Sequence, residues 1–224
     1  KEMPDACRMR GMRVQLCVLP LGVEDGQGKW ESNKYIVPKV AQEHPEWLIL
    51  DKNGKHARMT RDLAALCPAV PEVQAYFKKL TEKFIGEWGF DGSKLDNIYS
   101  VPMCYNPAHH HKSPQDSVNA MADVYKTIFQ TSRALKPESV TQSCPCGTPP
   151  SLAWLPFIDQ AVTADPVGAV QVRRRIKMHK ALLGPESAGD GDHVEISAMD
   201  RTGTTRAAHG EDYASTTGGA GVAG

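Results

Sequence analysis

The stretch GEWGFDGSKLDN, residues 86–97, decides the fold class of this chain. Apolar residues at helical spacing lead into it, and Gly89 supplies a stop signal of the kind that ends helices. Residues 90–96 are short and half apolar, which predicts a buried strand of an α/β protein. The strand closes on the carboxylate of Asp96, with Lys94 on the same strand face. The helical apolar positions are Val73, Phe77, Leu80, Phe84 and Trp88.

The position of Asp96 has two interpretations. In a (β/α) barrel the carboxyl ends of the strands face the active site, so Asp96 and Lys94 would be placed for chemistry. Alternatively, Asp96 caps the N-terminus of a following helix. The residues around it leave both interpretations open.

Strand and helix patterns alternate along the whole chain. This alternation predicts a parallel sheet with crossover helices, an α/β fold of the barrel type. We expect residues 1–200 to form the barrel region and residues 201–224, rich in Gly, Ala and Thr, to be a poorly ordered tail or the start of a last strand. The predicted strands are 13–21, 90–96, 139–143, 159–165 and 191–196, and we expect the strand at 13–21 to be buried. The predicted main helices are 73–88, 116–135 and 171–183, and residues 24–33 are predicted to form a polar loop.

Composition excludes several classes of partner. The 224 residues carry 26 basic and 26 acidic side chains, so neither nucleic acid nor an acidic membrane surface has electrostatic support. No apolar run reaches transmembrane length, and residues 1–13 lack a signal peptide's apolar segment, which favours a cytoplasmic location. The six cysteines are scattered and several lie in apolar runs, which is typical of reduced, buried thiols.

Two short motifs suggest metal binding. Three adjacent histidines, His109, His110 and His111, cannot all face one ion, so we expect an exposed, metal-free polar loop. The pair Cys144 and Cys146 is half of a zinc motif that no second cysteine pair completes. We therefore expect no metal or cofactor, and a metal hydrolase that combines these histidines with these cysteines remains an alternative.

A second carboxylate follows another predicted strand. Asp165 ends residues 159–165, as Asp96 ends residues 90–96. Two buried carboxylates from different strands at one barrel face are the equipment of a glycosidase, with one as nucleophile and the other as acid/base. A retaining mechanism requires their carboxyl groups to lie about 5–5.5 Å apart.

Several segments form an ordered series over residues 8–218: GMRVQLCVLPL (11–21), HPEWLI (44–49), RDLAALCPAVPEVQAYF (61–77), WGFDGSKLD (88–96), SCPCG (143–147), TAD (163–165) and GDHVEIS (191–197). In this order they resemble the catalytic barrel of the α-galactosidases of glycoside hydrolase family 36, in the clan of the melibiases. Residues 11–21 resemble the third barrel strand of that family, and residues 88–96 resemble its strand carrying Lys-x-Asp.

The resemblance implies a (β/α)8 TIM barrel, of which this chain would hold about strands three to eight. It implies a retaining hydrolase of terminal α-galactosides, without a cofactor, with an oligosaccharide or galactoside as its substrate. The residues to which it assigns roles are Asp96 (nucleophile), Asp165 (acid/base), Lys94 and Arg61 (sugar hydroxyls), and Cys144 with Gly147 (galactose subsite).

The chain departs from the family pattern at several positions. Leu63, Cys67, Ala164 and Pro166 stand where the family has other residues, and the aromatic and acidic motif of the first barrel strand is absent. We therefore expect an open barrel with an apolar edge at residues 13–21, and self-association of the chain. A non-catalytic carbohydrate-binding remnant of a glycosidase barrel is the alternative function.

Overall fold

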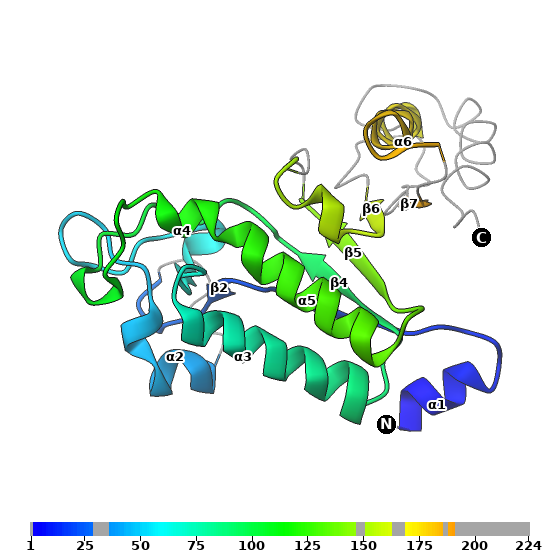
Figure 1. The fold of residues 1–224 in the computed structure, drawn as a ribbon, viewed down its shortest axis with the longest axis horizontal. Coiled ribbons are helices and arrows are strands. Elements are labelled where there is room, and N and C mark those ends of the chain that lie inside the picture. Colours follow the sequence, from blue (N-terminus) through cyan, green and yellow to red (C-terminus); the bar gives the residue numbers. More distant parts are fainter. Residues whose placement is uncertain (1, 29–35, 147–150, 163–168, 186–187, 191–224) are drawn as a thin grey trace, which may run out of the picture.

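A five-stranded parallel sheet forms the centre of the structure, a computed structural model that describes residues 2–28, 36–146, 151–162, 169–185 and 188–190 (Figure 1). Its strand order is β1-β4-β5-β6-β7, and every neighbouring pair runs parallel. The order follows the chain, as expected when each strand is joined to the next by a crossover. The strands are β1 (Gln15–Val18), β4 (Gly92–Asp96), β5 (Val140–Cys144), β6 (Gln160–Val162) and β7 (Ala188–Asp190).

Helices connect the strands. The helix α3 lies between β1 and β4, α5 lies between β4 and β5, and α6 lies between β6 and β7. Helices α3 and α5 run side by side along the sheet (Figure 1). The helices are α1 (Glu2–Arg8), α2 (Lys39–Glu43), α3 (Pro71–Thr81), α4 (Asp116–Asn119), α5 (Met121–Leu135) and α6 (Ala169–Leu183). Shorter elements are the 3-10 turns η2 (Pro45–Trp47), η3 (Thr60–Asp62), η5 (Pro107–His109) and η6 (Leu155–Phe157), the π-helical turn η4 (Glu82–Glu87), and the antiparallel pair β2 (Gly22–Val23) and β3 (Ala64–Ala65).

The two faces of β4 have different environments. Leu95 is fully buried in the main hydrophobic core with Val73 of α3 and Val124 of α5. Because side chains alternate along a strand, Lys94 and Asp96 lie on the face opposite these helices. The prediction that Lys94 and Asp96 lie on the same face of one strand is confirmed.

The predicted helix over residues 73–88 ends differently from its pattern. After Thr81 the backbone widens into the π-helical turn, closed by a hydrogen bond from the Trp88 amide to the Lys83 carbonyl at 2.9 Å. A π-turn holds an extra residue, so the apolar face shifts by one position. Ile85 is therefore buried, while Trp88, predicted on the apolar face, is 41% exposed. Gly89, with φ of 81°, ends the helix as predicted.

The strand predicted at residues 13–21 is shorter and less buried than expected. Only Gln15–Val18 is a strand, it pairs with β4 alone within the described residues, and Cys17 is exposed. An edge strand is covered on fewer sides than a central one, so an apolar run alone overestimates its burial. The strand predicted at residues 191–196 lies outside the described residues.

The predicted polar loop at residues 24–33 contains a buried charge cluster. The Asp25 side chain is 3% exposed and pairs with Arg58 through both oxygens at 2.9 Å and with His56 Nδ1 at 2.6 Å. Burial opposes ionisation, but the hydrogen bonds from Arg58 and His56 lower the pKa of Asp25 to about 2. Asp25 is therefore structural, which the polarity of the loop did not predict.

No helix in the described part of the chain is both long enough and apolar enough to cross a membrane.

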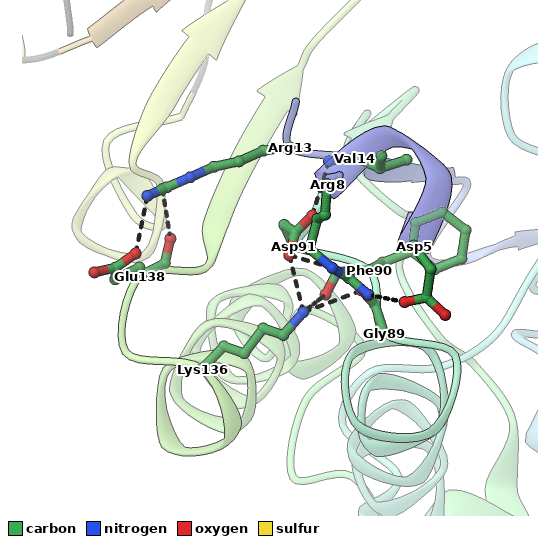
Figure 2. A network of polar contacts seen from close by, with 9 residues as sticks. All are labelled: Asp5, Arg8, Arg13, Val14, Gly89, Phe90, Asp91, Lys136 and Glu138. Atoms are coloured by element: carbon green, nitrogen blue, oxygen red, sulfur yellow. Dashed lines mark hydrogen bonds and ion pairs between the residues drawn. The ribbon is translucent and has the colours of Figure 1, made fainter. Parts of the chain in front are cut away.

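Asp91, directly before β4, joins three elements (Figure 2). Its side chain accepts hydrogen bonds from Lys136 Nζ at 2.9 Å and from the Val14 amide at 3.0 Å, and Arg8 of α1 lies at 3.4 Å. Lys136 Nζ also donates to the Gly89 and Phe90 carbonyls. Burial would raise the pKa of Asp91, but the Lys136 hydrogen bond lowers it below its ordinary value. The network fastens the amino end of β4 to α1, β1 and the end of α5.

We expect Asp91→Asn to lower the free energy of unfolding by about 2 kcal/mol at neutral pH, because Lys136 and Arg8 would lose their charged partner. The folded-state pKa is depressed, so the unfolded chain binds the proton first as pH falls. The stability difference between wild type and variant should therefore shrink below about pH 4. Urea unfolding at several pH values measures it, with Asp123→Asn on the exposed face of α5 as control. A difference independent of pH would contradict this assignment.

Gly92→Ala should be strongly destabilising. A Cβ at this position would lie 2.1 Å from the Val140 carbonyl oxygen, and both groups belong to paired backbone. We expect a loss of about 3 kcal/mol in urea unfolding, at the upper end of overpacking costs. The control is Gly86→Ala, whose added methyl would meet only Leu135 at 3.9 Å. Equal stabilities of the two variants would show that the β4–β5 approach is looser than described.

Candidate active site

The carboxyl ends of β4 and β5 bring Asp96 beside Cys144. The two residues are register partners, and they occupy the last positions of their strands. In parallel α/β sheets, side chains at this edge form ligand and active sites. The alternative interpretation of Asp96 as a helix cap is wrong, since the next helical turn begins at Pro107.

Both carboxylate oxygens of Asp96 have partners. Asn97 Nδ2 donates to Oδ2 at 2.8 Å, and the Cys146 thiol donates to Oδ1 at 3.2 Å. These two contacts come from different loops and set the orientation of the carboxylate. The residue is half-buried.

The loop after β5 folds back onto the loop after β4. The Asn97 amide donates to Cys146 Sγ at 3.3 Å, and the Tyr99 hydroxyl donates to the Cys146 carbonyl at 2.8 Å. Cys144 Sγ lies 3.4 Å from Cys146 Sγ. These contacts give Cys146 a role beyond the half zinc motif that the sequence suggested.

The thiols around Asp96 have pKa values shifted in opposite directions, since the hydrogen bond with Cys144 lowers the pKa of Cys146. The Cys146 thiol and burial raise the pKa of Cys144 well above its ordinary value. Cys17 on β1 is exposed as a residue, but partial desolvation of its thiol and, next, the Asp96 carboxylate raise its pKa.

Backbone strain is present at this site. Five non-glycine residues in the described part of the chain have positive φ: Asn97 (49°) and Cys146 (42°) contact each other beside Asp96, Arg61 (61°) and Asp62 (55°) lie in η3, and His110 (53°) lies in the histidine loop. Such conformations cost on the order of 1–3 kcal/mol each and persist where the surroundings hold them, typically at functional sites.

The two basic residues predicted to bind sugar hydroxyls, Lys94 and Arg61, lie in different parts of the structure. Lys94 is half-buried and lies two residues before Asp96 on the same face of β4. Its register partners are Cys17 of β1 and Gln142 of β5. Arg61 is exposed in η3 and shares the lining of a small cavity, about 20 Å³, with Asn97 and Tyr99. The structure thus relates Arg61 to the loop after Asp96, and Lys94 to Asp96 itself.

A larger cavity of about 450 Å³ opens on the other side of Arg61. It is lined mainly by apolar groups, among them Leu19, Leu63 and Phe77. Asp96, Lys94 and Cys144 are not part of its lining, so its size does not make it the chemical site.

Polar residues missed by the sequence reasoning extend the site into the sheet. Gln142 of β5 and Gln160 of β6 are buried and joined by a 3.2 Å hydrogen bond between their amides. Their signal in the sequence is a glutamine inside each predicted strand. Asn97 and Tyr99 carried no such signal.

Two predicted site residues lie outside the described residues: Asp165, the expected acid/base, and Gly147. The distance between the Asp96 and Asp165 carboxyl groups therefore stays a prediction.

The histidine loop does not join this site. His109 and His111 are half-buried and face Cys67 and Cys104, and only His110 is exposed as predicted. Among the described residues, no potential metal-binding group combines a histidine with Cys144 or Cys146. The alternative of a metal hydrolase built from those residues is wrong, because the fold carries the histidines to other cysteines.

Comparisons with known proteins agree with this architecture. The curated relative "A type blood alpha-D-galactosamine galactosaminidase" of Flavonifractor plautii is 36% identical over 171 residues, which cover 73% of this chain and 16% of that protein. The chain thus spans about a sixth of that relative.

Solved structures share the fold at lower identity. The α-galactosidase TtGalA of Thermus thermophilus, solved with stachyose, superposes with a TM-score of 0.63 at 18% identity, over 98% of this chain and 47% of that one. The GH36 α-galactosidase AgaA of Geobacillus stearothermophilus gives a TM-score of 0.66 at 16% identity, over 95% of this chain and 28% of that one. The parallel sheet with its helices is therefore part of a TIM-barrel catalytic domain of this type.

The melibiase family matches residues 27–217. That range includes β4 with Asp96, β5 with Cys144, and the loops that join them at the candidate active site. The chain belongs to the melibiase family of glycoside hydrolases.

Proposed function

We propose that this chain carries the catalytic centre of a retaining glycoside hydrolase that acts on terminal α-galactosides. The observation that carries the proposal is the position of Asp96, which ends β4 at the carboxyl edge of the sheet within a held, strained loop pair. Family membership supports the reaction class, since it makes glycosidic bonds the substrate to expect.

In the first step, Asp96 attacks the anomeric carbon through an oxocarbenium-like transition state and forms a glycosyl-enzyme ester. The general acid, which we assign to Asp165, gives its proton to the leaving oxygen. In the second step Asp165 takes a proton from water, and that water displaces Asp96 with net retention.

The surroundings of Asp96 suit this role. Asn97 and the Cys146 thiol donate to its oxygens and hold the carboxylate in one orientation, which reduces the cost of reaching the attack geometry. Lys94 and Arg61 would bind sugar hydroxyls, and Cys144 with Gly147 would line the sugar subsite. The Cys144 thiol, whose pKa is raised, offers a weak donor without adding charge.

A second candidate substrate is a terminal α-galactosamine. The observation that favours it is the 36% identity to the galactosaminidase, against 16–22% for the α-galactosidases of known structure that were compared. The two substrates differ at C2, where one carries an amine and the other a hydroxyl. Their relative turnover therefore distinguishes the candidates without changing the mechanism.

We expect Asp96→Asn to lower kcat for an aryl α-galactoside, or for the corresponding aryl α-galactosaminide, on the order of 10⁴-fold, because the amide cannot form the ester. Steady-state hydrolysis of both substrates by wild type, Asp96→Asn and the exposed control Asp123→Asn measures this. The control should retain wild-type turnover.

A rescue experiment separates a nucleophile from a merely structural carboxylate. In Asp96→Gly, added azide should attack the anomeric carbon of an activated aryl α-glycoside and yield the β-glycosyl azide. Absence of this product, with a folded variant and an active wild type, would refute the assignment. A wild type inactive on both substrates would favour the carbohydrate-binding remnant.

A further inference from the structure

Two cysteines and two histidines meet at one point away from Asp96. Cys67 follows β3, whereas Cys104, His109 and His111 come from the long loop after β4. Their four ligand atoms all lie within 4.8 Å of one another, and both sulfurs are buried in the main core. We call these four residues the Cys/His cluster.

The spacing of the cluster fits a tetrahedral ion. Cys67 Sγ lies 3.1 Å from His111 Nε2, and Cys104 Sγ lies 3.2 Å from His109 Nδ1. Zinc bound at about 2.3 Å to sulfur and about 2.0–2.1 Å to nitrogen separates its tetrahedral ligands by about 3.3–3.8 Å. The two contacts would lengthen by a few tenths of an ångström, and the other separations, all within 4.8 Å, would close by at most about 1.5 Å.

The outer contacts leave the ligand atoms free to face inward. His109 Nε2 lies 2.6 Å from the Glu46 carbonyl, which can only accept, and 3.2 Å from Asn106 Nδ2. The carbonyl is the nearer partner, and Asn106 Nδ2 has the Leu48 carbonyl as its acceptor, so Nε2 carries the proton and Nδ1 presents its lone pair to the cluster. A ligating histidine usually donates its other N–H to a carbonyl or carboxylate in this way. Asn106 fixes the same turn, since its side chain accepts from the Ala108 amide at 3.1 Å and donates to the Leu48 carbonyl at 3.2 Å.

The donor types select the ion and the kind of site. Two thiolates and two imidazoles suit zinc, and the cluster includes no carboxylate that would favour magnesium or calcium. Four protein ligands fill a tetrahedral ion completely, which is typical of structural rather than catalytic zinc. An open cavity of about 530 Å³, lined in part by His109 and Glu46, offers a path for the ion.

We propose that Cys67, Cys104, His109 and His111 bind one Zn²⁺ ion as a closed structural site that ties the loop after β4 to the end of β3. The sequence-based expectation of a metal-free histidine loop considered these histidines without Cys67 and Cys104, which lie 44 and 5 residues from their contacts. Only the fold brings the two halves together.

The test is the zinc content of the full chain, purified without a histidine tag and measured by inductively coupled plasma mass spectrometry. We expect about one equivalent of zinc in wild type and less than about a fifth of that in Cys67→Ser and His111→Asn. The matched control is His110→Asn in the same loop, because asparagine tolerates the positive φ of 53° and the side chain lies outside the cluster. It should retain the full equivalent.

Measurements on wild type keep the proposal testable where a variant fails to fold. X-ray absorption at the zinc edge should give two sulfur and two nitrogen neighbours, and chelation should lower the melting midpoint by about 10 °C. Three outcomes overturn the proposal: wild type that takes up no zinc even when Zn²⁺ is supplied, a zinc shell without two sulfurs, or full zinc content in Cys67→Ser. A Cys67–Cys104 disulfide in the purified wild type would be one form of the first outcome, because the two sulfurs would then not be available to bind zinc.

Discussion

The candidate active site depends on how closely β5 approaches β4 at Gly92. The Val140 carbonyl occupies the space that any Cβ at this position would need, so only glycine permits the pairing. The same register that places Gly92 opposite Val140 places Asp96 opposite Cys144 four residues later. Asp91 holds this end of the strand through Lys136 and the Val14 amide. Contacts at the amino end of β4 thus set where the carboxylate lies at the other end.

The two ends of β4 are stabilised in different ways. At the amino end, charged partners surround Asp91 without any residue in a strained conformation at its contacts. At the carboxyl end, Asn97 and Cys146 both have positive φ, and each is held by the other's loop. This division is the one expected of a barrel, whose amino face serves stability and whose carboxyl face serves chemistry. Strain at Asn97 and Cys146 is therefore an argument for function that is independent of family membership.

Sequence reasoning succeeded where a local pattern carries the physics. The periodicity of α3 and α5, the stop at Gly89 and the strand ending on Asp96 all follow from spacing and from backbone preferences of single residues. It missed the π-turn that exposes Trp88, which is a local departure from the helical period. It also failed where distant partners decide: the burial of Asp25 by Arg58, and the contact of His111 with Cys67. Each of these contacts joins two residues that lie far apart in the sequence, and no helical or strand periodicity predicts that they meet. Tertiary packing overrode the local pattern in both cases.

The long loop after β4 also depends on contacts between residues that no local sequence pattern predicts. It runs from Asn97 to α4 with a single 3-10 turn, so side chains must hold it: the Asp116 carboxylate accepts from the Lys112 and Ser113 amides, and the Ser117 hydroxyl donates to the Pro102 carbonyl. These contacts fix its far half, whereas its near half carries Asn97 and Tyr99 beside the proposed nucleophile. The Cys/His cluster lies between the two halves and reaches across to β3. A zinc ion there would replace the weak hydrogen bonds between the histidines and the thiols with coordinate bonds. It would thereby anchor the loop that begins at the strained Asn97 to a separate part of the core.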